Sequence, residues 1–262
     1  MTIRGVMLDL DGTVYHGENP IPGAAEAVTR LRDRDRSLCF FSNNPLHDGA
    51  AYVERLQSMG VDARPGEACS SAVVTREYIG DRHAGEDVFV IGSEELREYV
   101  GATDANVVTE PGGADVLLAS WTDDFHYRDM VDALRALDDG TAFLGSDPDP
   151  TFPDDDGNPV PGSGAIIRSI AGVVERDPDK VLGKPSDVAV EAVLDRLGET
   201  PEDCLVVGDR LETDILLGER AGMQTALVRT GVTDERRLAD SDVSPDYVID
   251  SLADIDGIVE SD

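Results

Sequence analysis

Short hydrophobic runs alternate with amphipathic segments toward both ends of the chain. The runs predict buried strands, because they lack helical periodicity and end in turn-forming residues; they cover 3–8, 37–41, 204–207 and 225–228. Apolar positions spaced three and four residues apart predict helices over 23–35, 48–59, 67–79 and 212–221. Buried strands separated by amphipathic helices are typical of a doubly wound parallel sheet, so we predict an α/β fold.

The middle of the chain repeats this alternation on its own. Predicted strands cover 88–91, 105–108, 116–119 and 142–144, and predicted helices cover 94–100, 127–137 and 164–174. These elements suffice for a second, smaller α/β domain with its own hydrophobic core. We therefore predict a core domain built from 1–82 and 182–262, with a second domain inserted at 83–181.

A segment rich in Pro, Gly and Asp, GSDPDPTFPDDDGNPVPGSG, covers residues 145–164 of the inserted domain. It is too long and too rich in turn formers for a simple connection, so we expect a functional or mobile loop. Gly162-Ser163-Gly164 suggests a dinucleotide-binding loop, but Ile167 stands where the third glycine belongs. We interpret these residues as a turn that begins a helix.

The charge of the chain is strongly negative. Its 262 residues include 54 Asp and Glu against 22 Lys and Arg, a formal net charge of −32. This balance argues against a nucleic-acid or anionic-membrane partner, whose phosphates Lys and Arg would have to meet. The acids are spread along the chain, and its only lysines are Lys180 and Lys184. Such a composition resembles that of extreme halophiles, in which molar salt screens self-repulsion. An acidic protein that binds a basic partner is the alternative.

Cysteine and histidine usage indicates neither a disulfide nor a zinc site. Cys39, Cys69 and Cys204 form no C-x-x-C motif, so we expect small buried thiols in a reducing compartment. The histidines, at 16, 47, 83 and 126, show no i, i+4 pairing. Apolar runs stay far below the roughly 18 residues of a membrane span, and Asp9 interrupts the first one. We expect a cytoplasmic protein without a membrane partner.

The sequence Asp9-Leu10-Asp11-Gly12-Thr13 directly follows the first predicted strand. Two carboxylates at such a strand end face the crevice in which α/β sheets bind ligands. One carboxylate there can act as a covalent nucleophile, and a neighbour with a higher pKa can move protons. The alternative is a surface Asp-Gly turn, which is common in so acidic a chain.

Two further motifs suit the binding of an anion. Ser42-Asn43-Asn44-Pro45 offers a hydroxyl and amides, although a plain turn is the alternative. Gly183-Lys184-Pro185 keeps a lysine in a chain that uses arginine nearly everywhere, which favours a use for its compact charge over chance retention. This motif is not a nucleotide-binding P-loop, because Pro178 occupies the position of the first glycine.

Asp209 and Asp214 follow the strand predicted at 204–207. With Asp9 they can complete a site for a hard cation such as Mg2+, which prefers a few carboxylates together with water and substrate phosphate. The alternative is an N-cap with first-turn acids on the next helix, a role that the same residues fill.

In this order, the motifs resemble those of the haloacid dehalogenase (HAD) superfamily of phosphohydrolases across essentially the full chain. DLDGT is similar to motif one, Ser42 to motif two, Lys184 to motif three, and Asp209 with Asp214 to motif four. SNNP, GKP and GDRLETDILLGERAGMQTALVRTGV resemble the NagD-like, p-nitrophenylphosphatase branch. The resemblance implies a Rossmann-like core with an α/β cap, which matches the insertion at 83–181.

The resemblance also implies a mechanism with a metal ion. Asp9 would attack phosphorus to form an aspartyl-phosphate. Asp11 would protonate the leaving alkoxide and then deprotonate the water that hydrolyses the intermediate. Mg2+ would be held by Asp9, the main-chain carbonyl of Asp11 and Asp209, with Asp214 orienting a water on the ion.

Phosphoryl binding falls, by the same resemblance, to Ser42, Asn43 and Lys184. Haloacid dehalogenases lack an acid at the position of Asp11, because halide leaves without a proton, so we favour a phosphatase. We expect a small phosphorylated metabolite such as a sugar phosphate, glycerol phosphate or phosphoglycolate, with p-nitrophenyl phosphate as a surrogate. A dehalogenase and a catalytically silent acidic binding protein are the alternatives, and either a monomer or a homodimer fits.

The resemblance is weaker in the cap. The branch commonly has Thr-Asn-Pro-Asp where this chain has Ser146-Asp147-Pro148-Asp149, and Gly-Leu-Asp-Arg where it has Ser120-Trp121-Thr122-Asp123. Ser42 stands where Thr is usual and keeps the hydroxyl. We hypothesise that Asp147 selects the substrate and disfavours acidic leaving groups, because a carboxylate only accepts hydrogen bonds. A solvated loop acid is the alternative.

Overall fold

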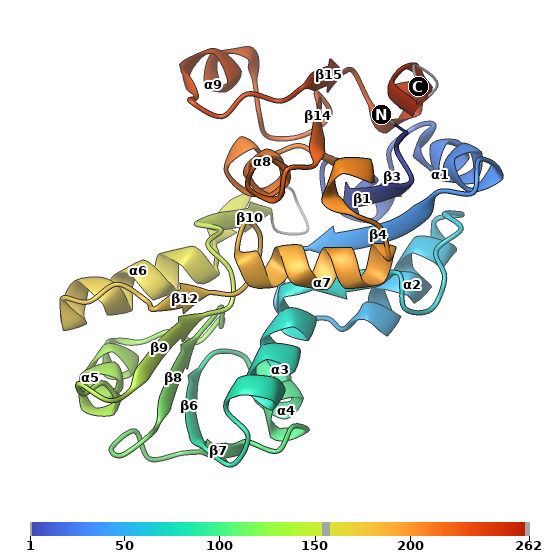
Figure 1. Ribbon diagram of the computed structural model, residues 1–262. Coiled ribbons are helices and arrows are strands. Elements are labelled where there is room, and N and C mark those ends of the chain that lie inside the picture. Colours follow the sequence, from blue (N-terminus) through green and yellow to red (C-terminus); the bar gives the residue numbers. More distant parts are fainter. Residues whose placement is uncertain (1, 154–157, 260–262) are drawn as a thin grey trace. The chain divides into compact units, whose positions relative to one another are not determined.

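The computed structural model describes residues 2–153 and 158–259, so residues 154–157 of the Pro-, Gly- and Asp-rich segment lie outside the described residues. The chain divides into two compact units (Figure 1). The first unit comprises Met1–Ser42, Asp48–Cys69 and Ala189–Asp262, and the second comprises Asn43–His47 and Ser70–Val188. The predicted domain boundaries, 1–82 and 182–262 for the core and 83–181 for the insertion, stay a prediction. A compact unit is not by itself a domain, because a domain must also be able to fold on its own.

The first unit is built on a six-stranded sheet with the order β15-β14-β13-β1-β4-β5. Parallel pairs join β1 to β13 and β4, β13 to β14, and β14 to β15. The strands cover Gly5–Asp9 (β1), Ser37–Ser42 (β4), Ala68–Ser70 (β5), Cys204–Gly208 (β13), Gln224–Val228 (β14) and Tyr247–Ile249 (β15). Successive strands are added outward from β1 on one side and from β13 on the other. The topological switch point of this doubly wound sheet therefore falls between β1 and β13.

Helices α1, α2 and α10 of the first unit contribute buried apolar side chains to the main hydrophobic core. In α1 the buried positions are Ala24, Ala27, Val28 and Leu31, the spacing that predicted the helix. The helices are α1 (Ala24–Asp33), α2 (Gly49–Ser58), α8 (Leu216–Ala221), α9 (Glu235–Asp240) and α10 (Asp256–Val259). Smaller elements are the hairpin of β2 (Tyr15–His16) with β3 (Asn19–Pro20) and 3-10 turns at Pro201–Asp203 and Leu252–Asp254. Helix α7 (Asp187–Leu197) crosses the boundary between the units.

Of two helices predicted from the sequence, the one at 67–79 is wrong at its first turn, and the one at 212–221 is helical but begins with a π-helical turn. The helix predicted at 67–79 begins only at Ser71, because Phe40 N donates to Glu67 O over 2.8 Å and the residues that follow form β5 beside β4. The helix predicted at 212–221 begins with a π-helical turn, Leu211–Ile215, in which Ile215 N reaches back to Arg210 O over 3.2 Å. Tertiary contacts override local periodicity at both places.

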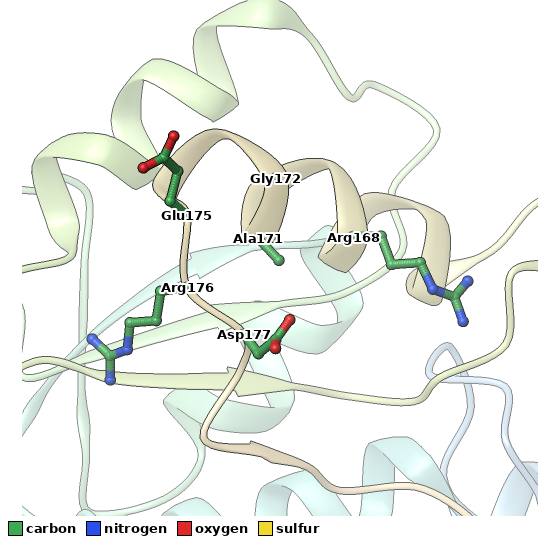
Figure 2. Close-up of a pocket in the computed structure, with 6 residues that line it drawn as sticks. All are labelled: Arg168, Ala171, Gly172, Glu175, Arg176 and Asp177. Carbon is green, nitrogen blue, oxygen red and sulfur yellow. The ribbon is translucent and has the colours of Figure 1, made fainter.

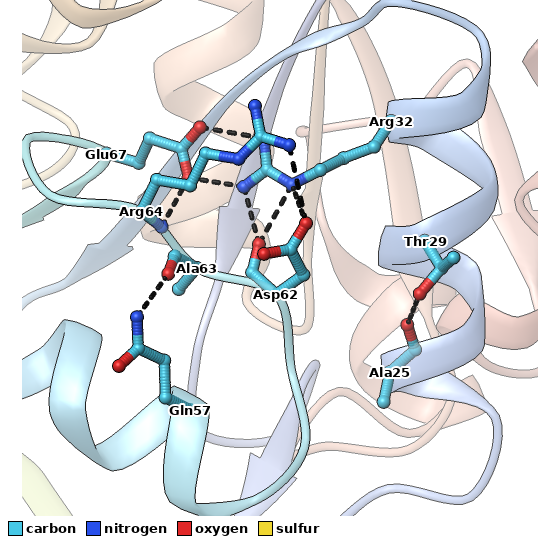
Figure 3. Close-up of polar contacts among 8 residues, drawn as sticks. All are labelled: Ala25, Thr29, Arg32, Gln57, Asp62, Ala63, Arg64 and Glu67. Atoms are coloured by element: carbon cyan, nitrogen blue, oxygen red, sulfur yellow. Dashed lines mark hydrogen bonds and ion pairs between the residues drawn. The ribbon is translucent and has the colours of Figure 1, made fainter.

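An ion-pair network fastens α1 to the segment that follows α2 (Figure 3). Arg32, whose side chain is 9% exposed, donates to Glu67 Oε1 over 2.8 Å and lies 2.9 Å from Asp62 Oδ2. Arg32 also donates to the main-chain oxygen of Asp62. Nearby, Gln57 donates to Ala63 O over 2.8 Å and closes the end of α2. The planar guanidinium fork thus meets acceptors from several directions, among them the partly buried Glu67 and the exposed Asp62.

The second unit is a smaller α/β layer structure, as the alternation at 83–181 predicts. Its parallel sheet has the order β12-β9-β8-β6-β7. The strands cover Asp87–Ile91 (β6), Asn106–Val108 (β7), Val116–Ala119 (β8), Ala142–Gly145 (β9) and Lys180–Val181 (β12). The helices cover Ser71–Arg82 (α3), Glu94–Gly101 (α4), Tyr127–Ala136 (α5) and Ser163–Val174 (α6). A hairpin of β10 (Thr151–Pro153) and β11 (Pro159–Pro161) lies before α6, which Gly162 caps as predicted.

Candidate active site

The carboxylates of Asp9, Asp209 and Asp214 form one buried group in the first unit. Asp9 ends β1 and Asp209 directly follows β13, so two neighbouring parallel strands release them at the same edge, beside the switch point. Asp214 comes from the π-helical turn. One ligand atom of each lies within 4.8 Å of the others, and the residues are 8%, 1% and 0% exposed. Val232 N donates to Asp209 Oδ2 over 2.7 Å and orients that carboxylate.

Glycines make room for these acids. Gly12 has a φ of 92°, and a Cβ there would stand 2.6 Å from Asp209 Oδ2. A Cβ on Gly231 would overlap the same carboxylate, and a Cβ on Gly208 would overlap Asp214. The loops can approach the acids so closely only because these positions carry no side chain.

Asp11 lies outside the buried group, on the exposed side of the same loop. Its Oδ1 stands 3.6 Å from Nδ1 of His16, whose Nε2 is 2.7 Å from Thr230 O. Partial burial raises the pKa of Asp11 above its usual value, and His16, Arg55 and Arg210 oppose this rise. A carboxyl that keeps its proton to higher pH beside a second carboxylate suits general acid and base chemistry.

Ser42 ends β4, the neighbour of β1, and is half-buried. The phenolic oxygen of Tyr52, on α2, donates to Ser42 Oγ over 3.2 Å. Burial raises the pKa of Tyr52 to about 12, so the phenol keeps its proton and stays a donor.

Asn43 and Lys184 lie together in the second unit. Asn43 Oδ1 accepts from Lys184 N over 2.8 Å, and Asn43 Nδ2 donates to Lys184 O over 3.1 Å. Both residues are buried, Lys184 with 1% of its surface exposed. The structure thus gathers the predicted residues into two groups, the three aspartates in the first unit and this pair in the second.

Asp147 is buried and hydrogen-bonded, so its interpretation as a solvated loop acid is wrong. It is 2% exposed, and its carboxylate accepts from Ser146 Oγ over 2.9 Å and from Asp149 N over 3.2 Å. Ser163, at the start of α6, also hydrogen-bonds to it. Burial and the nearby Asp149 raise the pKa of Asp147 to about 8. The other departures in the cap differ from it: Thr122 is half-buried and Asp123 is exposed.

A surface hollow at the end of α6 contains none of the predicted site residues (Figure 2). Its lining is Arg168, Ala171, Gly172, Glu175, Arg176 and Asp177. The Arg176 guanidinium is already engaged, with Asp179 Oδ2 at 2.6 Å and Asp138 O at 3.3 Å. We assign the hollow no part in the chemistry.

Sequence reasoning missed Tyr52 and His16 as neighbours of the site. The spacing of Tyr52 with Val53 and Leu56 predicts only a helix face turned to the core, so no sequence signal marks its hydroxyl. The three cysteines are buried free thiols, as predicted. Within residues 2–153 and 158–259, no helix is long and apolar enough to cross a membrane.

Comparison with known proteins agrees with this geometry. The family model "Haloacid dehalogenase-like hydrolase" matches residues 6–106, and "HAD-hydrolase-like" matches residues 181–255. The sugar-phosphatase AraL of Bacillus subtilis is 31% identical over 98% of this chain and 93% of its own length. Human glycerol-3-phosphate phosphatase is 34% identical over 95% of this chain and 89% of its own. The p-nitrophenyl phosphatase structure from Archaeoglobus fulgidus superposes with a TM-score of 0.90, at 32% identity and with 100% of both chains covered.

The chain belongs to the HAD superfamily, in its NagD-like, p-nitrophenylphosphatase branch. It is a phosphomonoester hydrolase that acts on small phosphorylated compounds. This outcome removes the silent binding protein and the dehalogenase that the sequence alone left open.

Proposed function

We propose that the chain is a Mg2+-dependent phosphatase that hydrolyses small phosphomonoesters through a phosphorylated Asp9. The observation that carries the proposal is the convergence of Asp9, Asp209 and Asp214 beside the switch point of the sheet, within 4.8 Å of one another. A carboxylate nucleophile and a cation site coincide there.

The donor set of this group fits Mg2+. The ion takes hard oxygen ligands at about 2.1 Å, so opposite ligands of an octahedron stand roughly 4.2 Å apart, which the carboxylate spacing accommodates. Three buried carboxylates also need a counter-charge, because uncompensated charge away from water is costly. Asp9, Asp209 and the main-chain carbonyl of Asp11 would hold the ion, with Asp214 orienting one of its waters. When bound, Mg2+ offsets the charge of the phosphoryl oxygens.

Asp9 and Asp11 divide the chemistry between them. A carboxylate oxygen of Asp9 attacks phosphorus, and the bond from phosphorus to the leaving oxygen breaks. Asp11 donates its proton to that oxygen, a role that its raised pKa supports. Asp11 then takes a proton from the water that attacks the phosphoryl group on Asp9, which releases phosphate and restores both acids.

Ser42, Asn43 and Lys184 contribute the site of the phosphoryl oxygens. A hydroxyl donor and a buried ammonium suit an anion whose charge is spread over three oxygens, where positioning and electrostatics supply most of the catalysis. The names of the relatives support sugar phosphates and glycerol phosphate as substrates, and phosphoglycolate stays a third candidate. The inserted domain at 83–181 would select among them. We also place the protein in a salt-rich cytoplasm, for which the buried free thiols and the net charge of −32 are the support.

Phosphate release from p-nitrophenyl phosphate, measured in molar KCl with and without Mg2+, tests the proposal. We expect activity to vanish on dialysis against a chelator and to return with Mg2+. Asp209→Asn should raise the Mg2+ concentration for half-maximal activity by at least tenfold. Full activity of the chelated protein would contradict the proposal. A panel of sugar phosphates, glycerol phosphate and phosphoglycolate then ranks substrates by kcat/KM.

A further inference from the structure

Both polar atoms of the Asn43 side chain form hydrogen bonds with the main chain of Lys184. The carbonyl oxygen accepts from Lys184 N at 2.8 Å, and the amide nitrogen donates to Lys184 O at 3.1 Å. The main-chain oxygen of Asn43 accepts in turn from Ser71 Oγ at 2.6 Å. Asn43 is therefore held at one end by α3 and holds Lys184 at the other, within a single unit.

The turn that carries Lys184 is packed tightly around this contact. Gly183 N donates to Ser146 O over 2.7 Å, and a Cβ on Gly183 would stand 2.7 Å from Asn43 Oδ1 and 3.0 Å from Asp147 Cβ. The main chain at Lys184 consequently has little freedom to shift. Because a lysine side chain is flexible, the place of its ammonium depends on how firmly its own main chain is fixed.

We propose that Asn43 is a positioning residue, which acts on the phosphoryl group through Lys184 and not by contact of its amide with phosphate. The inference rests on the proposed function, in which Lys184 offsets phosphoryl charge. It separates two roles that the motif Ser-Asn-Asn joins: a hydroxyl for the anion at Ser42, and a clamp for the lysine at Asn43.

A double-mutant cycle tests this assignment. We would measure kcat and KM for p-nitrophenyl phosphate, at saturating Mg2+ and molar KCl, in wild type, Asn43→Ala, Lys184→Met and the double variant, with Asp9→Asn as the blank. Asn43→Ala should lower kcat/KM by roughly 10- to 100-fold, the size expected when a charged group is misplaced. In the Lys184→Met background the same change should cost less than about twofold, since the residue it positions is gone.

An equal loss in both backgrounds would overturn the proposal, because it would mean that Asn43 touches the substrate independently. Should Asn43→Ala fail to fold, Asn43→Asp keeps the size and the acceptor and enters the same cycle. Asn44→Ala is the matched control: Asn44 Oδ1 accepts from Leu46 N over 2.8 Å, so the variant loses a hydrogen bond within the same loop. It should stay within about twofold of wild type. A wild-type protein that releases no phosphate would contradict the proposed function itself and is a separate outcome.

Discussion

The phenol of Tyr52 donates its proton to the hydroxyl of Ser42 over 3.2 Å. This contact engages Ser42 Oγ as an acceptor and so restricts the rotation of the hydroxyl that we propose for phosphoryl binding. Since serine has no β-branch, its χ1 angle depends on such outside contacts. Tyr52 is 2% exposed and therefore supplies a well-fixed donor.

Tyr52→Phe should lower kcat/KM by about fivefold, equivalent to the roughly 1 kcal/mol of one hydrogen bond. Ser42→Thr in the Tyr52→Phe background should restore most of that loss, because the β-branch of threonine restricts χ1 without the phenol. Steady-state kinetics of the two single variants and the double variant decide the matter. Unchanged kinetics in Tyr52→Phe would leave Tyr52 with a packing role alone.

Asp9→Asn should abolish turnover while leaving the thermal melt close to that of wild type, because the amide has the same shape but is a poor nucleophile. Asp11→Asn should reduce kcat by roughly 10²- to 10⁴-fold, the usual contribution of general acid and base catalysis. Phosphate release and circular dichroism on the same samples check both. Activity near wild type in Asp9→Asn would refute covalent catalysis by Asp9.

Arg32→Ala should destabilise the protein by about 1 kcal/mol, because it removes a guanidinium that is 9% exposed and leaves the partly buried Glu67 carboxylate without this donor. Arg64→Ala is the natural control, since Arg64 is 61% exposed and lies 3.5 Å from the same Asp62 carboxylate. Its effect should stay below about 0.5 kcal/mol, as for other exposed ion pairs. Urea unfolding curves at constant KCl compare the free energies of unfolding of the two variants. Equal decreases in both variants would mean that burial does not explain the contribution of Arg32 to stability.

The melting temperature should rise as KCl is raised from low to molar concentration. A net charge of −32 repels itself until salt shortens the Debye length to about 3 Å near 1 M. Thermal melts across that range, with choline chloride as a second salt, measure the effect. A flat or falling melting temperature would refute the halophilic interpretation of the composition.

Asp147→Asn should gain stability relative to wild type as the pH rises. The pKa of Asp147 lies near 8 in the folded protein, above its unfolded value, so its protonated form favours folding. That contribution is complete below about pH 4 and is lost as the pH climbs toward 8, at up to about 1.4 kcal/mol per pH unit. In the wild-type protein the groups that surround this carboxyl are Ser146, Ser163 and Asp149. Urea unfolding of both proteins between pH 4 and 9 gives the difference, and parallel pH profiles would contradict it.

The same variant tests the specificity predicted from the sequence. Above pH 8, where the Asp147 carboxyl is ionised, Asp147→Asn should raise kcat/KM for phosphoglycolate relative to glycerol phosphate by about tenfold. An unchanged ratio would assign the buried carboxyl to stability and remove it from substrate choice.

Much of the site was predictable from the sequence, because two of its aspartates lie at the ends of predicted strands. Asp9 and Asp209 follow continuous apolar runs, and parallel neighbours place such residues at one edge. The burial of Asp147 was not predictable, since Pro- and Asp-rich sequence normally indicates a solvated loop, and only Ser163 and its neighbours make the buried position tolerable. The hydrogen bonds between Asn43 and Lys184 were not predictable either, because they join residues 141 positions apart in the sequence. Hydrophobic periodicity predicts which face of a helix or strand is buried. The contacts of Asp147 and Asn43 depend instead on the exact positions of single polar atoms in the folded chain.

Gly12, Gly208 and Gly231 perform no chemistry, yet each lies where a methyl group would collide with Asp209 or Asp214. A saturation-mutagenesis library scored by activity would therefore lose its variants at these three positions as completely as at the aspartates themselves. Anyone ranking residues by such a screen would count them as catalytic. The substitutions that this enzyme tolerates are therefore limited as much by the glycines that pack against Asp209 and Asp214 as by the aspartates themselves.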